Sequence, residues 1–261
     1  MKTQNPHSFL NKFKKPFTFS LIILPFAVIG GYFIGIYIFE TSNEEAKSEI
    51  IRKVHNLRNF CLLTALQSSI YGLFCSFVGY IISESIGLMR PVRFDQKTLL
   101  KTGISTLFCG VLFSSDYFIF APLIPQLQDF YSKGINFANF ISALTYGGIV
   151  EEVIMRLFLM SLFSFILWKQ FARKYSKEII PSWIFITSNV ICAILFAALH
   201  LPSTVTMFGK LTPLLIFRCF FLNGAFGLVF GRFYRKYGIQ YSFLGHAGIH
   251  FISKVIWLIV L

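Results

Sequence analysis

Two adjacent carboxylates and a guanidinium interrupt an apolar stretch in the middle of the sequence, GGIVEEVIMRLFLM, residues 147 to 160. Glu152 and Arg156 are four residues apart, which on a helix places them on one face in the order that favours an ion pair. Glu151 is rotated by about 100° from Glu152 and points elsewhere. We therefore expect Arg156 to hold Glu152, while Glu151 is left free to act in a cavity. A buried ion-pair network that only fixes helix packing is the alternative for these three residues.

Three histidines follow in two later apolar segments. His200 ends FAALH, where Phe196 precedes it by one helical turn, and His246 and His250 are one turn apart in HAGIH. Together with Glu151, these side chains could activate a water, donate a hydrogen bond to an oxyanion or hold a metal ion. A histidine that is only packed and hydrogen-bonded is the alternative, and this alternative has more weight for His250 than for His200 and His246.

The elements that must position these residues are predicted to be membrane spans. The 261 residues are 55% hydrophobic and 13% charged, against roughly 25% charged residues in soluble domains. Apolar runs of about 18 residues or more are typical of transmembrane helices. Such runs cover residues 18–39, 60–82, 98–120, 140–168, 182–201, 211–230 and 239–260. The sequence therefore predicts an all-α, polytopic transmembrane helical bundle of about seven to eight spans.

The charge distribution indicates a lipid partner and no nucleic acid. The net charge is +13, but the lysines and arginines lie in short patches between the apolar runs, which suits an anionic membrane leaflet. Arg218 is an exception inside a predicted span, where it could reach the membrane surface or pair with a carboxylate. The five cysteines have no CxxC spacing, so neither disulfides nor a thiolate metal site is expected.

One shared site raises a geometric difficulty. At a rise of 1.5 Å per residue, His246 lies about 10 Å and His200 about 20 Å from the same membrane surface. A shared site therefore requires a tilted or broken helix, or a fifth span that continues past HLPSTV, residues 200 to 205.

Three motifs in this order resemble a known family. EEVIMR, residues 151 to 156, resembles the EExxxR motif of the CAAX protease and bacteriocin-processing (CPBP, or Abi) family of intramembrane proteases. FAALH resembles its FxxxH motif, and HAGIH resembles its terminal HxxxN or HxxxD motif. The resemblance covers residues 140 to 257, and His250 departs from it because the family usually has Asn or Asp there.

The resemblance implies a multi-span bundle with a cavity open to the membrane, in which peptide bonds are hydrolysed; the prenyl-CAAX endopeptidase is its eukaryotic example. It implies that Glu151 is the general base on the attacking water, with His200 as its partner. It further implies that His246 binds the developing oxyanion and that Glu152 and Arg156 support the site.

The role of His250 and the metal question are linked. His250 could donate to the oxyanion like the family's Asn, or it could complete a zinc site with Glu151, His200 and His246. The zinc-protease motif HExxH is absent, because Ala247 follows His246. We expect no cofactor, with zinc as the alternative.

We therefore expect residues 140–261 to form a CPBP-like protease core, and residues 1–139 to add spans without a recognised motif to the same transmembrane domain. The expected function is an intramembrane endopeptidase acting on membrane-associated or lipid-anchored peptides, in peptide maturation or bacteriocin self-immunity, in a bacterial cytoplasmic membrane. The alternative is a non-catalytic immunity or scaffold protein, or a proton-coupled transporter, since buried Glu and His also build proton relays.

Overall fold

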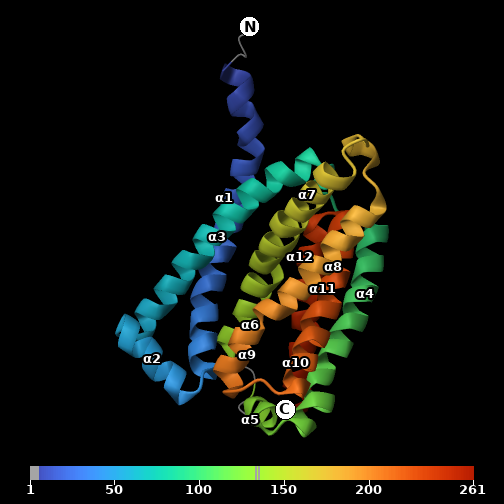
Figure 1. Cartoon of the computed structure of the whole chain (residues 1–261). Coiled ribbons are helices and arrows are strands. Elements are labelled where there is room, and N and C mark those ends of the chain that lie inside the picture. The colour runs from blue at the N-terminus through green and yellow to red at the C-terminus, as the bar shows by residue number, and fades with distance from the viewer. Residues whose placement is uncertain (1–5, 133, 135) are drawn as a thin grey trace.

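The computed structural model describes residues 6–132, 134 and 136–261, with side chains from Phe13 onward, and every regular element in these residues is a helix (Figure 1). Residues 1–5, 133 and 135 of the expected N-terminal part lie outside the described residues. The α-helices of the first half are α1 (Pro6–Thr41), α2 (Glu44–Val54), α3 (Leu57–Ser85), α4 (Gln96–Ser115), α5 (Pro125–Ser132) and α6 (Phe137–Ser142). Those of the second half are α7 (Ser161–Phe171), α8 (Ser182–Leu199), α9 (Leu201–Phe208), α10 (Pro213–Cys219), α11 (Phe226–Tyr237) and α12 (Ile239–Val260).

Short 3-10 and π-helical segments join several of these helices. They are η1 (Asp116–Phe120), η2 (Ala121–Leu123), η3 (Ala143–Glu151), η4 (Val153–Met160), η5 (Lys177–Ile179) and η6 (Phe220–Ala225). The π-helical segments η3 and η4 lie end to end around Glu152 and join α6 to α7, so that residues 137–171 are helical throughout. A π-helix bonds each amide to the carbonyl five residues earlier, is rare, and is frequently found at functional sites.

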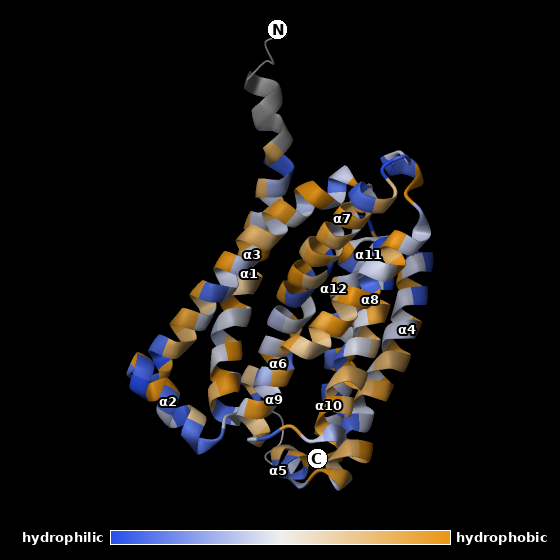
Figure 2. Cartoon of the chain, in the orientation of Figure 1, coloured by the Kyte–Doolittle hydropathy of each residue, from blue (hydrophilic) through white to orange (hydrophobic). Residues whose placement is uncertain are grey.

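The multi-pass membrane prediction is confirmed, with fewer spans than expected. In the part of the chain that the structure describes, six helices are long and apolar enough to cross a membrane: Phe13–Thr41, Leu57–Ser85, Gln96–Leu123, Ser182–Phe208, Pro213–Tyr237 and Ile239–Val260. Apolar residues run along these helices, whereas hydrophilic ones gather in α2 and in the loop between α7 and α8 (Figure 2). The run predicted as a span at 140–168 is not among the six. It carries Glu151, Glu152 and Arg156 in its π-helical part and packs against α1, α3, α8 and α12.

Several helices begin where a polar side chain satisfies the free amides of the first turn. Asn43 accepts from the amide of Ala46 at 2.8 Å at the start of α2, and Asp95 accepts from that of Thr98 at 2.9 Å at the start of α4. Such capping contributes about 1 kcal/mol per helix. These positions are local sequence signals that end the preceding loop and start the next helix.

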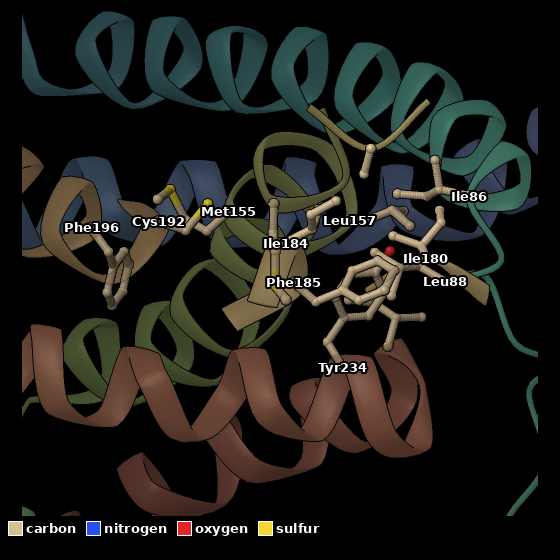
Figure 3. Close-up of a cluster of buried hydrophobic side chains, with 13 residues drawn as sticks. Ile86, Leu88, Met155, Leu157, Ile180, Ile184, Phe185, Cys192, Phe196 and Tyr234 are labelled. Carbon is tan, nitrogen blue, oxygen red and sulfur yellow. The ribbon is translucent and has the colours of Figure 1, made fainter. Parts of the chain in front are cut away.

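The core that supports the motif-bearing helices joins η4, α8 and α11 to the end of α3. Phe196 lies at one end of this row of buried side chains, and Ile86 and Leu88 lie at the other (Figure 3). Near the Ile86 end, the buried hydroxyl of Tyr234 is 2.6 Å from Ser83 Oγ and 2.8 Å from Ser161 Oγ. These two hydrogen bonds connect α3, α7 and α11, and thereby fix the end of the π-helical segment.

Arg218 is paired with a carboxylate rather than extended to the membrane surface. Its Nε donates to Asp116 Oδ1 at 2.6 Å, and the Tyr131 hydroxyl donates to Asp116 Oδ2 at 2.7 Å. Asp116 is 2% exposed, so its charge is compensated inside the protein. This cluster connects η1, α5 and α10 at the end of the bundle opposite α7 (Figure 1). The five cysteines are all buried and free, as the sequence predicts.

Candidate active site

A close approach of two backbones brings the carboxylates next to the last helix. A Cβ placed on Gly148 would lie 2.6 Å from Ala247 Cβ and 2.9 Å from its Cα. Cβ atoms essentially never pack this closely, so only glycine allows η3 and α12 to touch at this point. Glu151 and His246 follow and precede this contact by a few residues, and it therefore sets their separation.

The fifth span continues past His200. This removes the difference in membrane depth between His200 and His246 that the sequence predicts. α8 and α9 run on through HLPSTV as one candidate span, Ser182–Phe208, so His200 lies inside the span rather than at its end. Pro202 is tolerated there because it occupies the first turn of α9, where the missing amide has no helical partner. His200 Nδ1 is 2.7 Å from the carbonyl oxygen of Phe196, one turn earlier.

Glu151 faces two histidines from two different helices. Its Oε1 lies 3.9 Å from His200 Nε2, and its Oε2 lies 4.0 Å from His246 Nε2. The Glu151 side chain is 19% exposed and that of His200 31%, whereas that of His246 is 5% exposed. Glu151 and His200 can therefore be reached from outside the protein, and His246 lies behind them.

Glu152 has more partners than the sequence predicts. Its carboxylate is fully buried, lies 3.3 Å from Arg156 Nε, and accepts hydrogen bonds from the Ser242 hydroxyl and from His246 Nδ1, the latter at 2.9 Å. Arg156 is thus only one of three neighbours that hold Glu152. Ser242 was not predicted, although it precedes His246 by one turn and so must share its face of α12.

Arg156 is held mainly by charge and by aromatic faces. Its Nη2 donates to the Gly227 carbonyl at 3.0 Å, and its guanidinium lies 5.0 Å from the centre of the Phe196 ring and 5.6 Å from that of Phe230. Its Nε and Nη1 have no hydrogen-bond partner among the described residues. The 3.3 Å approach to Glu152 is therefore an ion pair without a well-aligned hydrogen bond.

Two phenylalanines frame the histidine rings. Phe196 meets His200 edge-on with ring centres 4.7 Å apart and His246 at 5.9 Å, and Phe230 stacks on His246 at 4.4 Å. Phe196 was predicted from its motif. Phe230 was not, because nothing in the sequence distinguishes it among 33 phenylalanines.

Residues 133–252 match the family described as type II CAAX prenyl endopeptidase Rce1-like. They form a domain of this family. The match includes every residue that the motifs single out, and family membership implies an intramembrane protease. No curated protein and no solved structure matches the chain.

In the Rce1-like domain, His250 contacts His246, which in turn faces Glu151. The two rings stack with centres 5.0 Å apart, and Phe113 of α4 meets His250 edge-on at 5.4 Å. A Cβ on Gly147 would lie 3.3 Å from His250 Nε2, so η3 passes directly over this ring. His250 Nδ1 is buried without a hydrogen-bond partner among the described residues.

Zinc is the alternative that the sequence leaves open for this site. Among the described residues, no group of three or more His, Cys, Asp and Glu side chains is arranged to hold a metal ion. We therefore derive no step through zinc. A cavity of about 280 Å³ lies elsewhere, against α1, α5, α6 and α9, and none of the motif residues lines it.

Proposed function

We propose that the Rce1-like domain hydrolyses peptide bonds within the membrane, with Glu151 as the general base on the attacking water. One observation carries the proposal: each oxygen of Glu151 faces Nε2 of a different histidine, at 3.9 and 4.0 Å. Glu152, by contrast, is fully committed to Ser242, His246 and Arg156. Of the two neighbouring carboxylates, only Glu151 is free to act on a substrate.

His200 is proposed to orient the attacking water. A carbonyl oxygen only accepts hydrogen bonds, so the 2.7 Å contact with Phe196 places a hydrogen on His200 Nδ1 and leaves Nε2 of the neutral ring as an acceptor. Nε2 and Glu151 Oε1 are then two acceptors 3.9 Å apart. That separation is too long for a direct hydrogen bond, and one water can donate to both.

His246 is proposed to stabilise the oxyanion as an imidazolium. Glu152 accepts from Ser242 and faces Arg156, so it is a carboxylate and His246 Nδ1 is the donor in their 2.9 Å bond. Nε2 can therefore donate to an oxyanion only when the ring carries a second proton. A buried carboxylate that orients and stabilises an imidazolium plays the same part in serine proteases. Glu151, Glu152, Arg156 and His246 then carry no net charge as a group.

The reaction follows from these positions. Glu151 takes a proton from water as the water oxygen bonds to the carbonyl carbon, and His246 donates to the resulting oxyanion, with His250 one turn further along. Protonated Glu151 then gives its proton to the leaving nitrogen as the C–N bond breaks. Water is the only co-reactant.

The setting supports membrane-associated or lipid-anchored peptides as substrates. His200 and His246 lie on two helices that are long and apolar enough to cross a membrane, and the matching family is described as a CAAX prenyl endopeptidase. In this proposal residues 140–261 supply the chemistry, and residues 1–139 enclose it through the packing of α1 against η3 and of α3 against η4. Peptide maturation or bacteriocin self-immunity in a bacterial cytoplasmic membrane are the roles that such an activity would serve.

The test compares two glutamates in purified protein reconstituted into liposomes. Quenched fluorogenic peptides anchored by a farnesyl or a myristoyl group report cleavage. Glu151→Gln keeps size and hydrogen bonding but removes the base, so we expect a loss of about 10²–10⁴-fold in kcat/KM. Glu84→Gln, at the exposed end of α3, is the matched control and should keep full activity. Cleavage of neither peptide by the wild type, or full activity in Glu151→Gln, contradicts the proposal and favours a non-catalytic or proton-transporting protein.

A further inference from the structure

A cavity lies at the end of the bundle where three candidate spans end. Thr41 and Phe208, which both line it, are the last residues of two spans, and α5 begins at Pro125, just after the third span ends at Leu123. Helices α5 and α9 lie at this same end of the bundle (Figure 1). Since spans end where the hydrocarbon core gives way to head groups, the cavity is at the level of the lipid head groups.

The size of the cavity limits what it can hold. Its volume is about 280 Å³, whereas ligand pockets are roughly 300–1,000 Å³. It therefore has room for a small polar group or one end of a head group, and not for a whole lipid.

The lining of the cavity favours a positive charge. Of the lining residues that the structure describes, none is a lysine or an arginine, although the chain has a net charge of +13. The lining combines carboxylates, side-chain amides and aromatic rings, among them Glu40, Asp129, Gln126, Asn136, Phe130 and Phe208. Carboxylate and amide oxygens accept hydrogen bonds, and aromatic faces attract cations. A small cation with N–H groups suits all three kinds of neighbour.

One lining carboxylate is held in place by a hydrogen bond from another helix. Asn136 Nδ2 donates to Glu40 Oε2 at 2.6 Å, while Asn136 Oδ1 accepts from the amide of Asn139 at 2.7 Å and so caps α6. Glu40 Oε1 has no hydrogen-bond or ion-pair partner within the part of the chain that the structure describes. The carboxylate is therefore oriented through one oxygen, and the other oxygen is available to a ligand.

We propose that this cavity binds the primary ammonium of a phospholipid head group, as in phosphatidylethanolamine. A primary ammonium has three N–H donors and no acceptor. Glu40 Oε1 can accept one of them in a charge-assisted bond, and the amide oxygens of the lining can accept others. A quaternary ammonium, as in phosphatidylcholine, has no N–H to donate. A lipid is the source that the location favours, because the span ends place the cavity where head groups lie.

The bound head group stabilises the arrangement of the helices around it. The helical segment that begins at α6 continues without a break through η3 to Glu151. A ligand held by Glu40 and Asn136 therefore joins the end of α1 to the start of the segment that carries the candidate base. Since only the folded protein has this cavity, the ligand raises the unfolding temperature. The inference concerns a lipid site and does not depend on the protease proposal.

The first experiment compares head groups on the full chain in detergent. Dihexanoyl phosphatidylethanolamine, phosphatidylcholine and phosphatidylglycerol are added in turn, and thermal unfolding is followed. At about one-hundred-fold above its Kd, the ethanolamine lipid should raise the Tm by about 5–10 °C, and the other two lipids should raise it much less. Equal shifts with the ethanolamine and choline lipids overturn the inference.

The same assay distinguishes the sources of the ammonium. Free ethanolamine should give no comparable shift at the same concentration. If ethanolamine alone gives the full shift, the ligand is a soluble amine. If a lysine-containing peptide displaces the lipid at a lower concentration than the lipid itself requires, the ligand is a peptide. Either result overturns the assignment to a lipid.

The second experiment places the head group on Glu40. Glu40→Gln removes the charge but keeps an acceptor for Asn136 Nδ2, so we expect an unchanged Tm without lipid and about ten-fold weaker binding of the ethanolamine lipid. Glu45→Gln is the matched control, because Glu45 is exposed on α2 and does not line the cavity; it should bind like the wild type. Wild-type affinity in Glu40→Gln overturns the inference.

An aromatic variant keeps the test decisive if Glu40→Gln unfolds early. Phe130→Leu leaves the hydrogen bond between Asn136 and Glu40 intact and removes one ring from the lining. We expect it to bind the ethanolamine lipid several-fold more weakly, because one cation–π contact is lost. Unchanged binding in Phe130→Leu, together with early unfolding of Glu40→Gln, would show that the lining serves the fold and holds no ligand.

Discussion

His246 Nδ1 donates to Glu152 Oε1 at 2.9 Å, and this bond joins the π-helical segment to α12 at the centre of the candidate site. This bond determines that Nε2 of His246 is the nitrogen that faces Glu151. Its acceptor is Glu152, for which the sequence predicts Arg156 as the only partner. The two adjacent glutamates consequently have different tasks. Glu151 is partly exposed, whereas Glu152 is buried and is part of the frame.

The first prediction separates the two glutamates by stability. Glu152→Gln leaves the Arg156 guanidinium, 1% exposed, without its carboxylate, and a buried charge left unpaired costs about 3–5 kcal/mol. We expect Glu152→Gln to lower the free energy of unfolding by about this amount and to abolish cleavage. Glu151→Gln should lose cleavage at unchanged stability. Equilibrium unfolding in detergent micelles measures both, and equal stability of the two variants would show that Glu152 is not the structural one.

The second prediction concerns the contact at Gly148. Gly148→Ala forces a Cβ to within 2.6 Å of that of Ala247, so η3 and α12 must separate at a cost of about 1–3 kcal/mol. Since Glu151 and His246 lie on either side of this contact, cleavage should fall by an order of magnitude or more. Gly103→Ala on α4 is the control, because a Cβ there has nothing within 4 Å. It should be neutral or stabilise the helix by up to about 1 kcal/mol.

The third prediction concerns Phe196. Its ring contacts His200, His246 and the Arg156 guanidinium, and such aromatic contacts contribute about 0.5–1.5 kcal/mol each. Phe196→Leu should lower kcat more than it raises KM, because the ring orients the reacting groups. Phe165→Leu is the control, since Phe165 also contacts a cation, at 5.6 Å from Lys169 Nζ, but lies in α7 away from the motif residues. A change in KM alone for Phe196→Leu would place this ring in substrate binding instead.

The fourth prediction distinguishes an oxyanion donor from a metal ligand at His250. His250→Asn supplies an amide donor in place of the ring. The family that the sequence resembles usually has Asn or Asp at this position. We expect cleavage to stay within about ten-fold of the wild type, as for the loss of a partial contribution to an oxyanion site. A chelator such as 1,10-phenanthroline should leave the rate unchanged. Loss of cleavage in both experiments would instead support the zinc alternative.

The structure differs from the sequence-based expectation in the type of one helix and in the length of another. The run expected as a span at 140–168 contains two π-helical segments, Ala143–Glu151 and Val153–Met160. The fifth span continues to Phe208 rather than ending near residue 201. Hydropathy locates apolar runs within a few residues, but it does not record how each turn is hydrogen-bonded or where a proline is accepted into a first turn.

The sequence by itself determined that the chain is a multi-pass helical membrane protein, and it located six of the seven expected apolar runs that the structure has as candidate spans. It also determined which charged side chains interrupt the apolar runs, because both depend on the residue types along one helix. It also determined the pairing of Glu152 with Arg156, which follows from a spacing of four. Only the tertiary structure decided that Glu151 faces His200 and His246 and that Ser242 and Phe230 complete the frame. Each of these depends on the distance between helices that are remote in the sequence, and the close approach of Gly148 to Ala247 is one of the contacts that set it.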